Sequence, residues 1–249
     1  MWRVIIDEKD GFLSMAYDEI ILEANLRGIA PKTLRLYVIN PSAVTIGYFQ
    51  KIHDIVNLDF TNKNRIPVIR RITGGGAVYH DSQGEITYSV VAPISEIASD
   101  VQESYKIICM GIVNALKKFN LNAVFKPIND VIVNGKKISG SAQIRRKNYL
   151  LQHGTLMYNT NLEILSQTLK PLKEKLASHG IASIKQRVTT ISLELGRKVS
   201  KDEVINKMLE GFKEALDDDF KMGTYTDWER EHVYEIVKKY KNPEWTFKR

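Results

Sequence analysis

The stretch that decides the fold lies near the middle of the chain, where residues 130–138 run Asp-Val-Ile-Val-Asn-Gly-Lys-Lys-Ile. Strand-forming residues flank Asn134 and Gly135, and an Asn-Gly pair readily adopts the positive φ angles of a type I′ turn. The stretch therefore predicts a β-hairpin, and with it a sheet whose neighbouring strands run antiparallel.

Further strand and helix patterns surround this hairpin. Strands are expected at 2–6, 34–38, 43–46 and 150–158, and a second hairpin at 77–80 and 86–92, whereas residues 68–72 form an apolar segment interrupted by arginines. A helix is expected to begin at Ser14, whose side chain can cap its N-terminus. Further helices are expected at 101–119, 162–169, 202–216 and 226–240. Hairpins interleaved with helices predict an α+β fold, with mainly antiparallel sheets packed with helices. No repeat or low-complexity linker divides residues 1–249, so we expect a single domain.

Composition excludes several classes of protein. Hydrophobic residues make up 43% of the 249 residues and charged residues 26%, which is ordinary globular usage and excludes a disordered chain. No apolar run approaches the ~18 residues of a membrane helix, so no membrane partner is expected. Cys109 is the sole cysteine, which excludes an internal disulfide framework and favours a cytoplasmic location.

The first segment with chemical character runs from Arg70 to Asp81 as Arg-Arg-Ile-Thr-Gly-Gly-Gly-Ala-Val-Tyr-His-Asp. Three glycines let a backbone approach a ligand closely and direct N–H groups at an anion, and the arginines can pair with phosphate or carboxylate. A triple glycine alone supports only a flexible turn, but beside two arginines and a predicted hairpin it favours a phosphate cradle. The segment matches neither the P-loop nor the Gly-x-Gly-x-x-Gly motif.

Two later segments add candidate groups. Asn129 to Gln143 contains the first hairpin, and strand alternation places Lys136 and Lys137 on opposite faces, so that one can face inward and stabilise a reacting anion. Taken alone, the pair is better explained as exposed lysines beside a tight turn. Residues 151–156, Leu-Gln-His-Gly-Thr-Leu, place His153 in a strand, where it either lines a pocket or is an ordinary core histidine.

In this order and spacing, the segments together resemble the lipoate–protein ligase A family, within the superfamily of biotin and lipoate ligases and octanoyl/lipoyl transferases. The resemblance runs from Trp2 to about Arg249 and includes Met-Ala-Tyr-Asp-Glu at 15–19, Thr-Ile-Gly-Tyr-Phe-Gln at 45–50 and Tyr-Lys-Asn-Pro-Glu-Trp at 240–245. The last of these resembles the end of the family's large domain. The smaller accessory domain of many members has no counterpart here, so a separate small accessory protein is expected.

The resemblance implies a biotin/lipoate protein ligase-like catalytic domain and a two-step reaction. Lipoate and MgATP form lipoyl-AMP and pyrophosphate, and the lipoyl group then passes to one lysine of an acceptor lipoyl domain. The catalytic residue implied is Lys137, which stabilises negative charge in both steps. The implied ATP and lipoyl-AMP site comprises Arg70, Arg71, Thr73, Gly74, Gly75, Gly76, Ala77, Val78, Tyr79, His80, Asn129, Asp130 and Lys137. The implied lipoyl pocket comprises Ser139, Gly140, Ala142, His153, Gly154 and Thr155, and the implied Mg²⁺ contact is Asp130.

An octanoyl or lipoyl transferase that uses an acyl-carrier or protein-bound donor is the nearest alternative. The transferases that this chain resembles place their nucleophilic cysteine just before the lysine hairpin, where this chain has Lys-Pro-Ile-Asn-Asp at 126–130. Cys109 falls in the middle of a predicted amphipathic helix and is expected to be a small core residue. The sequence therefore favours the ATP-dependent ligase.

The charge balance bears on the partner. Lys and Arg number 36 against 29 Asp and Glu, a net charge of +7, which favours an acidic partner. A non-catalytic, basic nucleic-acid-binding protein is a second alternative, but the aromatic residues are not arranged as stacking pairs on a basic strand. We therefore expect no nucleic-acid partner. The expected acceptors are acidic lipoyl domains, from acyltransferase subunits of 2-oxoacid dehydrogenases or from glycine cleavage H-type proteins.

Overall fold

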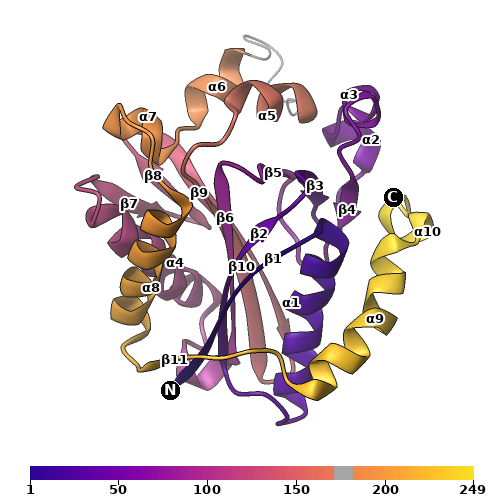
Figure 1. The fold of residues 1–249 in the computed structure, drawn as a ribbon, viewed down its shortest axis with the longest axis vertical. Coiled ribbons are helices and arrows are strands. Elements are labelled where there is room, and N and C mark those ends of the chain that lie inside the picture. The colour runs from indigo at the N-terminus through magenta and orange to yellow at the C-terminus, as the bar shows by residue number, and fades with distance from the viewer. Residues whose placement is uncertain (171–181) are drawn as a thin grey trace.

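The computed structural model describes residues 1–170 and 182–249, which form an eight-stranded and a three-stranded sheet with helices packed around them (Figure 1). The strands are β1 Trp2–Lys9, β2 Thr33–Ile39, β3 Ala43–Ile46, β4 Val68–Arg70, β5 Val78–His80, β6 Glu85–Pro93, β7 Ala123–Lys126, β8 Asp130–Val133, β9 Lys136–Arg146, β10 Tyr149–Met157 and β11 Phe220–Met222. The helices are α1 Gly11–Leu26, α2 Ile52–Ile55, α3 Leu58–Lys63, α4 Val101–Lys117, α5 Leu162–Thr168, α6 Ala182–Arg187, α7 Ile191–Leu195, α8 Lys201–Leu216, α9 Asp227–Lys241 and α10 Pro243–Thr246, with a 3₁₀ turn η1 at Ile94–Glu96.

The larger sheet has the strand order β11-β1-β2-β6-β10-β9-β8-β7, and the smaller has the order β4-β3-β5. In the larger sheet β1 runs parallel to both β2 and β11, and the other neighbouring pairs are antiparallel. The α+β fold with mainly antiparallel sheets is therefore confirmed. The Asn-Gly hairpin is confirmed as well, since Asn134 and Gly135 join β8 to β9 with φ angles of 50° and 77°.

Helices cover both faces of the larger sheet, with α4 and α8 on one face and α1 and α9 on the other (Figure 1). Strand β2 contributes side chains to the hydrophobic cores on both faces of the sheet, because its side chains alternate. Leu34 and Leu36 pack with α4 and α8, whereas Tyr37 and Ile39 pack with α1 and α9. The central strands are buried on both faces for this reason. The three-stranded sheet has its own small core, formed around Val44, Ile46 and Tyr79.

Side-chain caps fix the starts of the long helices, and one of them corrects the sequence prediction. Helix α1 begins after Asp10, whose carboxylate accepts hydrogen bonds from the amides of Phe12 and Leu13, whereas Ser14 lies inside the helix and is buried. The prediction that Ser14 caps this helix is therefore wrong, because the carboxylate four residues earlier satisfies the free amides of the first turn. Thr226 and Glu229 form a capping box at the start of α9.

The second predicted hairpin, between 77–80 and 86–92, is also corrected. Both segments form strands, but β5 pairs with β3 in the small sheet, and β6 lies between β2 and β10 in the large sheet. Both edges of β6 are occupied, so β5 has no edge of that strand to pair with. The turn at 81–84 instead carries the chain from one sheet to the other. Within residues 1–170 and 182–249, no helix combines the length and apolar character needed to cross a membrane.

Candidate active site

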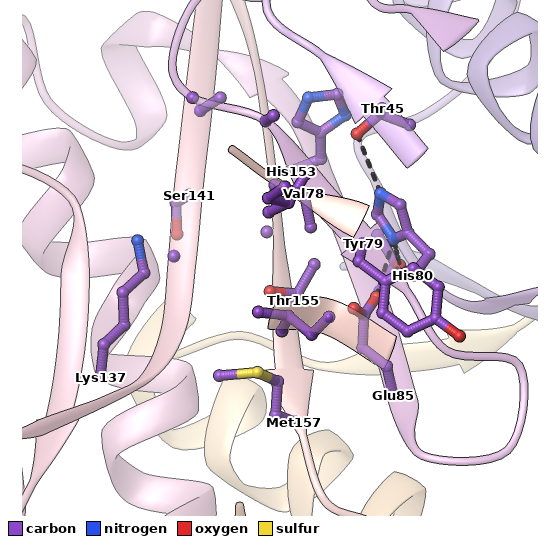
Figure 2. A pocket seen from close by; sticks show the side chains of 18 of the residues that line it. Thr45, Val78, Tyr79, His80, Glu85, Lys137, Ser141, His153, Thr155 and Met157 are labelled. Carbon is purple, nitrogen blue, oxygen red and sulfur yellow. Dashed lines mark hydrogen bonds and ion pairs between the residues drawn. The ribbon is translucent and has the colours of Figure 1, made fainter. Parts of the chain in front are cut away.

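A cavity of about 320 Å³ opens between the small sheet and strands β9 and β10 of the large sheet (Figure 2). Both sheets contribute to its wall, with Val78, Tyr79 and His80 on one side and Lys137 on the opposite side (Figure 2). Apolar walls with a few convergent polar groups are typical of small-molecule sites. This cavity holds most of the residues that the sequence motifs single out.

The charges around the cavity favour an anion. The described cations that line it are Arg71, Lys137, Lys170 and Arg187, whereas the one acid among its described lining residues is Glu85. The Glu85 carboxylate is buried, and one of its oxygens forms a 2.8 Å hydrogen bond with Nδ1 of His80. A cleft lined by excess positive charge raises the local concentration of anionic ligands. Carboxylates and phosphates are therefore the ligand groups that the cavity suits.

The glycine loop, residues 74–76, joins β4 to β5 at the cavity and depends on close backbone contacts. Gly75 has a φ angle of 86°, which residues other than glycine rarely adopt. A Cβ atom at Gly47 would overlap the carbonyl oxygen of Gly75, so this neighbour must also be glycine. Nη2 of Arg71 donates hydrogen bonds of 2.7 Å to the carbonyl oxygens of both Gly74 and Gly76. Arg71 thus holds the loop from inside while Gly75 and Gly76 stay exposed.

Lys137 lies on β9 and faces the cavity, whereas Lys136 is exposed to solvent. The predicted alternation of the two lysines is therefore confirmed. Nζ of Lys137 lies 2.6 Å from Oδ1 of Asp130 on β8, in a partly exposed ion pair. The lysine side chain passes directly over Gly140, where an added Cβ would lie 2.5 Å from Nζ. Glycine at this position thus leaves room for the ammonium group beside Asp130.

His153 on β10 is buried and has a partner at each ring nitrogen. Nδ1 lies 2.9 Å from Oδ2 of Asp18 on α1, and Nε2 lies 2.7 Å from Oγ1 of Thr73. Burial lowers the pKa of His153, and this outweighs the opposite effect of Asp18. The pKa of Asp18 is itself lowered: burial acts to raise it, but hydrogen bonding to His153 and the charge of Arg35 outweigh that effect. A neutral histidine beside an ionised aspartate is therefore expected at neutral pH.

The structure brings most of the predicted site residues together at the cavity wall. The predicted residues that line it are Arg71, Gly76, Ala77, Val78, Tyr79, His80, Asn129, Lys137, Gly140, Ala142, His153, Gly154 and Thr155. The predicted residues outside this lining are Arg70, Thr73, Gly74, Gly75, Asp130 and Ser139. Of these, Gly74 and Gly75 belong to the loop at its rim, and Asp130 contacts it through Lys137.

Arg70 has a different position from its neighbour Arg71. Its guanidinium is fully buried and donates to carbonyl oxygens of two separate segments, residues 47–50 and residues 245–246. These bonds tie the end of the described chain to the loop after β3. The geometry therefore supports a structural role for Arg70, and its expected contact with nucleotide has no support from this placement.

Sequence reasoning did not select several residues of the cavity wall. These are Met15, Tyr37, Thr45, Glu85, Thr87, Ser141, Met157, Leu165, Leu169, Lys170, Arg187 and Val188. Met15, Thr45 and Ser141 stand inside the segments that carry the family resemblance, which was the available signal. Lys170 and Arg187 stand in no motif, and only the tertiary fold brings these charges to the cavity.

The single cysteine lies behind the cavity wall. Cys109 on α4 is fully buried in the larger core, which confirms the prediction that it is a core residue. Its Sγ atom is 3.5 Å from Oγ of Ser141, whose residue lines the cavity. Burial raises the pKa of the thiol to about 11, so the thiolate is disfavoured at neutral pH.

Among residues 1–170 and 182–249, no cluster of three or more His, Cys, Asp or Glu side chains could hold a metal ion by itself. Mg²⁺ that arrives with a nucleotide is commonly held by one or two carboxylates together with phosphate oxygens. Asp130, at the edge of the cavity beside Lys137, fits that more limited role.

Comparisons with known proteins agree with this geometry. The family model described as "Lipoyl protein ligase A/B catalytic domain" matches residues 10–213. The chain is 33% identical to "Octanoyltransferase LipM" of Clostridioides difficile, an alignment that covers 100% of this chain and 99% of the relative.

Two solved structures are also similar. One is the bi-partite lipoate protein ligase of Thermoplasma acidophilum, described with its E2 lipoyl domain, with a TM-score of 0.87, 35% identity, and coverage of 98% of this chain and 95% of the other. The second is a lipoate-protein ligase A bound with ATP, with a TM-score of 0.85, 34% identity and coverage of 98% of both chains. The fold, the placement of the motifs around one cavity and these matches together show that the chain belongs to the lipoyl protein ligase A/B catalytic domain family.

Proposed function

We propose that the chain is an ATP-dependent lipoate–protein ligase, which activates lipoate as lipoyl-AMP and transfers the lipoyl group to a lysine of a lipoyl domain. The observation that carries this proposal is the position of Cys109. The sole thiol of the sequence is buried behind the cavity wall and its pKa is raised, so it is poorly suited to form an acyl-enzyme. Activation by adenylation needs no protein nucleophile.

In the first proposed step, a carboxylate oxygen of lipoate attacks the α-phosphorus of ATP. A new P–O bond forms, the bond between the α-phosphorus and the bridging oxygen breaks, and pyrophosphate leaves. Negative charge accumulates on the α-phosphate as two anions approach each other. The ammonium group of Lys137 faces the cavity and is the candidate to stabilise this charge, which lowers the barrier more than it stabilises the separated substrates.

In the second proposed step, the neutral ε-amine of the acceptor lysine attacks the acyl carbon of lipoyl-AMP. An amide bond forms, AMP leaves, and the proton of the amine passes to solvent. We expect Lys137 to stabilise the departing phosphate of AMP as well, because its side chain lines the same cavity. One fixed cation thereby serves both steps.

ATP and Mg²⁺ are the cofactors of this proposal, and the residues present fit them. The exposed glycine loop and the cations Arg71 and Lys137 suit phosphate groups, while Asn129 and Asp130 offer oxygen atoms near Lys137. When bound, Mg²⁺ would neutralise phosphate charge. We expect Lys137 to exchange its contact with Asp130 for the nucleotide phosphate.

We also propose an acidic lipoyl domain as the acceptor and a separate small protein as an accessory subunit. The net charge of +7 supports attraction of an acidic partner, which accelerates association at low ionic strength. The similar Thermoplasma ligase is described as bi-partite and with an E2 lipoyl domain. Pyrophosphate release measured with the chain alone tests whether the accessory subunit is required. Fast, multiple turnovers without any second protein would contradict that requirement.

Octanoyl transfer is the second candidate function, because the relative from Clostridioides difficile that matches the full chain is named an octanoyltransferase. Mass spectrometry of an apo lipoyl domain separates the two. One reaction contains lipoate and MgATP together with the accessory candidate, and the other contains octanoyl-acyl-carrier protein without ATP. The ligase proposal expects a lipoyl mass increase in the first reaction alone. Modification in the second reaction alone would contradict it.

The variant Cys109→Ala sharpens this test. The ligase proposal expects it to keep parental turnover, because the thiol lies behind the wall and touches no substrate. Loss of turnover with an unchanged thermal midpoint would favour a thiol mechanism instead. The thermal midpoint is the necessary control, since removing a buried sulfur from the core costs some stability.

A further inference from the structure

A continuous chain of hydrogen bonds connects the buried helix α1 to the glycine loop. Asp18 on α1 contacts Nδ1 of His153, and Nε2 of His153 contacts the hydroxyl of Thr73, at 2.9 Å and 2.7 Å. Nε of Arg71 donates to the same hydroxyl at 2.9 Å, and its Nη2 donates to the carbonyl oxygens of residues 74 and 76. Asp18 and Thr73 lie outside the cavity lining, so they reach a ligand only through other residues.

The chemistry of each group gives these bonds one direction. An ionised Asp18 only accepts, so the proton of His153 lies on Nδ1, and a neutral ring leaves Nε2 as an acceptor. The Thr73 hydroxyl therefore donates to His153, and its oxygen lone pairs remain for Arg71. A carboxylate that fixes a histidine tautomer in this way thereby also fixes the orientation of the hydroxyl group beyond it.

Arg71 depends on these partners because all of its described hydrogen bonds are with neutral groups, and no described carboxylate bonds to it. Besides Thr73, its guanidinium donates to the hydroxyl of Thr45 and to the two loop carbonyls. The side chain is buried, and burial lowers its pKa to about 10. A buried guanidinium whose Nε loses its acceptor leaves an unsatisfied charged donor, which is costly, so the group is expected to move.

We propose that Asp18 and Thr73 are positioning residues for Arg71. Asp18 acts through His153 and Thr73, whereas Thr73 contacts Arg71 directly, and through Arg71 both hold the glycine loop in the geometry that accepts the nucleotide phosphate. The proposal rests on the proposed function for the identity of the ligand, whereas the hold on the loop does not depend on it. Charged and titratable groups around the path support the same arrangement. Arg35 and Tyr37 on β2 bond to Asp18, and His80 on β5 contacts Thr45 from the other side.

Thr73→Val and Thr73→Ser are the test pair, because valine keeps the shape of threonine without its hydroxyl and serine keeps the hydroxyl. The first measurement is amide hydrogen exchange of the peptides that contain Tyr48 and Arg71, whose N–H groups bond to the carbonyls of Thr73 and Ile46. Thr73→Val should exchange on the order of tenfold faster in these peptides, and Thr73→Ser should match the parent. Equal exchange in Thr73→Val and parent would overturn the hold on the loop.

The second measurement is calorimetric affinity for a non-hydrolysable lipoyl-adenylate analogue. The expected result is a loss of about tenfold or more in Thr73→Val and less than threefold in Thr73→Ser. Equal affinity of both variants would refute the functional half of the inference. A parent that does not bind the analogue would instead count against the ligase proposal, and the exchange experiment would still decide whether Thr73 holds the loop.

A second pair of variants guards against misfolding at residue 73. His153→Gln keeps an amide N–H for Asp18 and an oxygen for Thr73, whereas His153→Leu removes both. The inference expects exchange near the parental rate in His153→Gln and faster exchange in His153→Leu. The reverse order, or no difference between the two, would contradict it.

Discussion

Replacing Gly140 by alanine tests whether the path of the Lys137 side chain is essential. A Cβ at Gly140 would lie 2.5 Å from Nζ and 2.6 Å from Cε of Lys137. Ordinary carbon contacts begin near 3.5 Å, so the end of the lysine must move by about 1 Å. A misplacement of that size in an active site costs on the order of 10²-fold in rate, or about 2.7 kcal/mol in the barrier.

The same substitution should hardly change stability. The displaced atoms are the flexible end of a side chain, and the ion pair with Asp130 is partly exposed, so its loss costs roughly 0.5 kcal/mol. The smaller backbone entropy of an unfolded alanine chain offsets about as much. We therefore expect a thermal midpoint within about 2 °C of the parent.

The assay is lipoate-dependent pyrophosphate release in the presence of the accessory candidate, with lipoyl-AMP detected by mass spectrometry. Lys136→Ala is the control for a change on the exposed face of the same strand. Gly140→Ala should form lipoyl-AMP on the order of 10²-fold more slowly than the parent. Lys136→Ala should form it at the parental rate. The reasoning is refuted if Gly140→Ala works within twofold of the parent while Lys137→Ala is inactive. A large fall in thermal midpoint would show that the added methyl group displaces the surrounding structure and not only the end of the Lys137 side chain.

Three further outcomes are expected. Lys137→Ala should abolish adenylate formation and Lys136→Ala should keep it; parental activity of the Lys137 variant in the pyrophosphate assay would remove the assignment. Gly47→Ala should lower both stability and nucleotide affinity, because the added atom meets the backbone of Gly75; an unchanged urea midpoint and affinity would contradict this. Burial lowers the pKa of His153, so the unfolded chain binds its proton more readily, and stability should fall as pH drops below ~6.5. His153→Gln should lose this part of the pH dependence, measured as urea midpoints at pH 7.5 and 5.5.

Local patterns predicted the elements and failed where tertiary contacts decide between partners. The Asn134-Gly135 turn was predictable because two positive φ angles need those residue types. The separation of β5 from β6 was not, since it depends on β2 and β10 occupying both edges of β6. The cap of α1 is a third case, in which Asp10 and Ser14 are both good capping residues and the structure uses Asp10.

The candidate site shows the same limit. Strand alternation predicted that either Lys136 or Lys137 faces inward. This prediction was possible because the alternation of side chains is a property of a single strand and does not depend on neighbouring elements. Nothing local distinguishes Arg70 from Arg71, yet one is tied to carbonyl groups away from the cavity and the other holds the glycine loop. Lys170 and Arg187 reach the cavity from segments without a motif. The periodicity of a sequence cannot predict that charged side chains from distant parts of the chain lie together in the folded protein.

The position of Cys109 bears on which of two chemistries, that of a ligase or that of a transferase, this chain performs. Both chemistries need an acyl pocket and a fixed cation at the acyl carbon, and we expect the cavity with Lys137 to supply them. They differ in how the acyl group is activated, and a thioester route needs a thiolate open to the donor. Here the thiol lies 3.5 Å behind the Ser141 hydroxyl, on a core helix rather than before the lysine hairpin. A thiol mechanism would require α4 to turn a buried side chain through the cavity wall, whereas adenylation uses the wall as it stands.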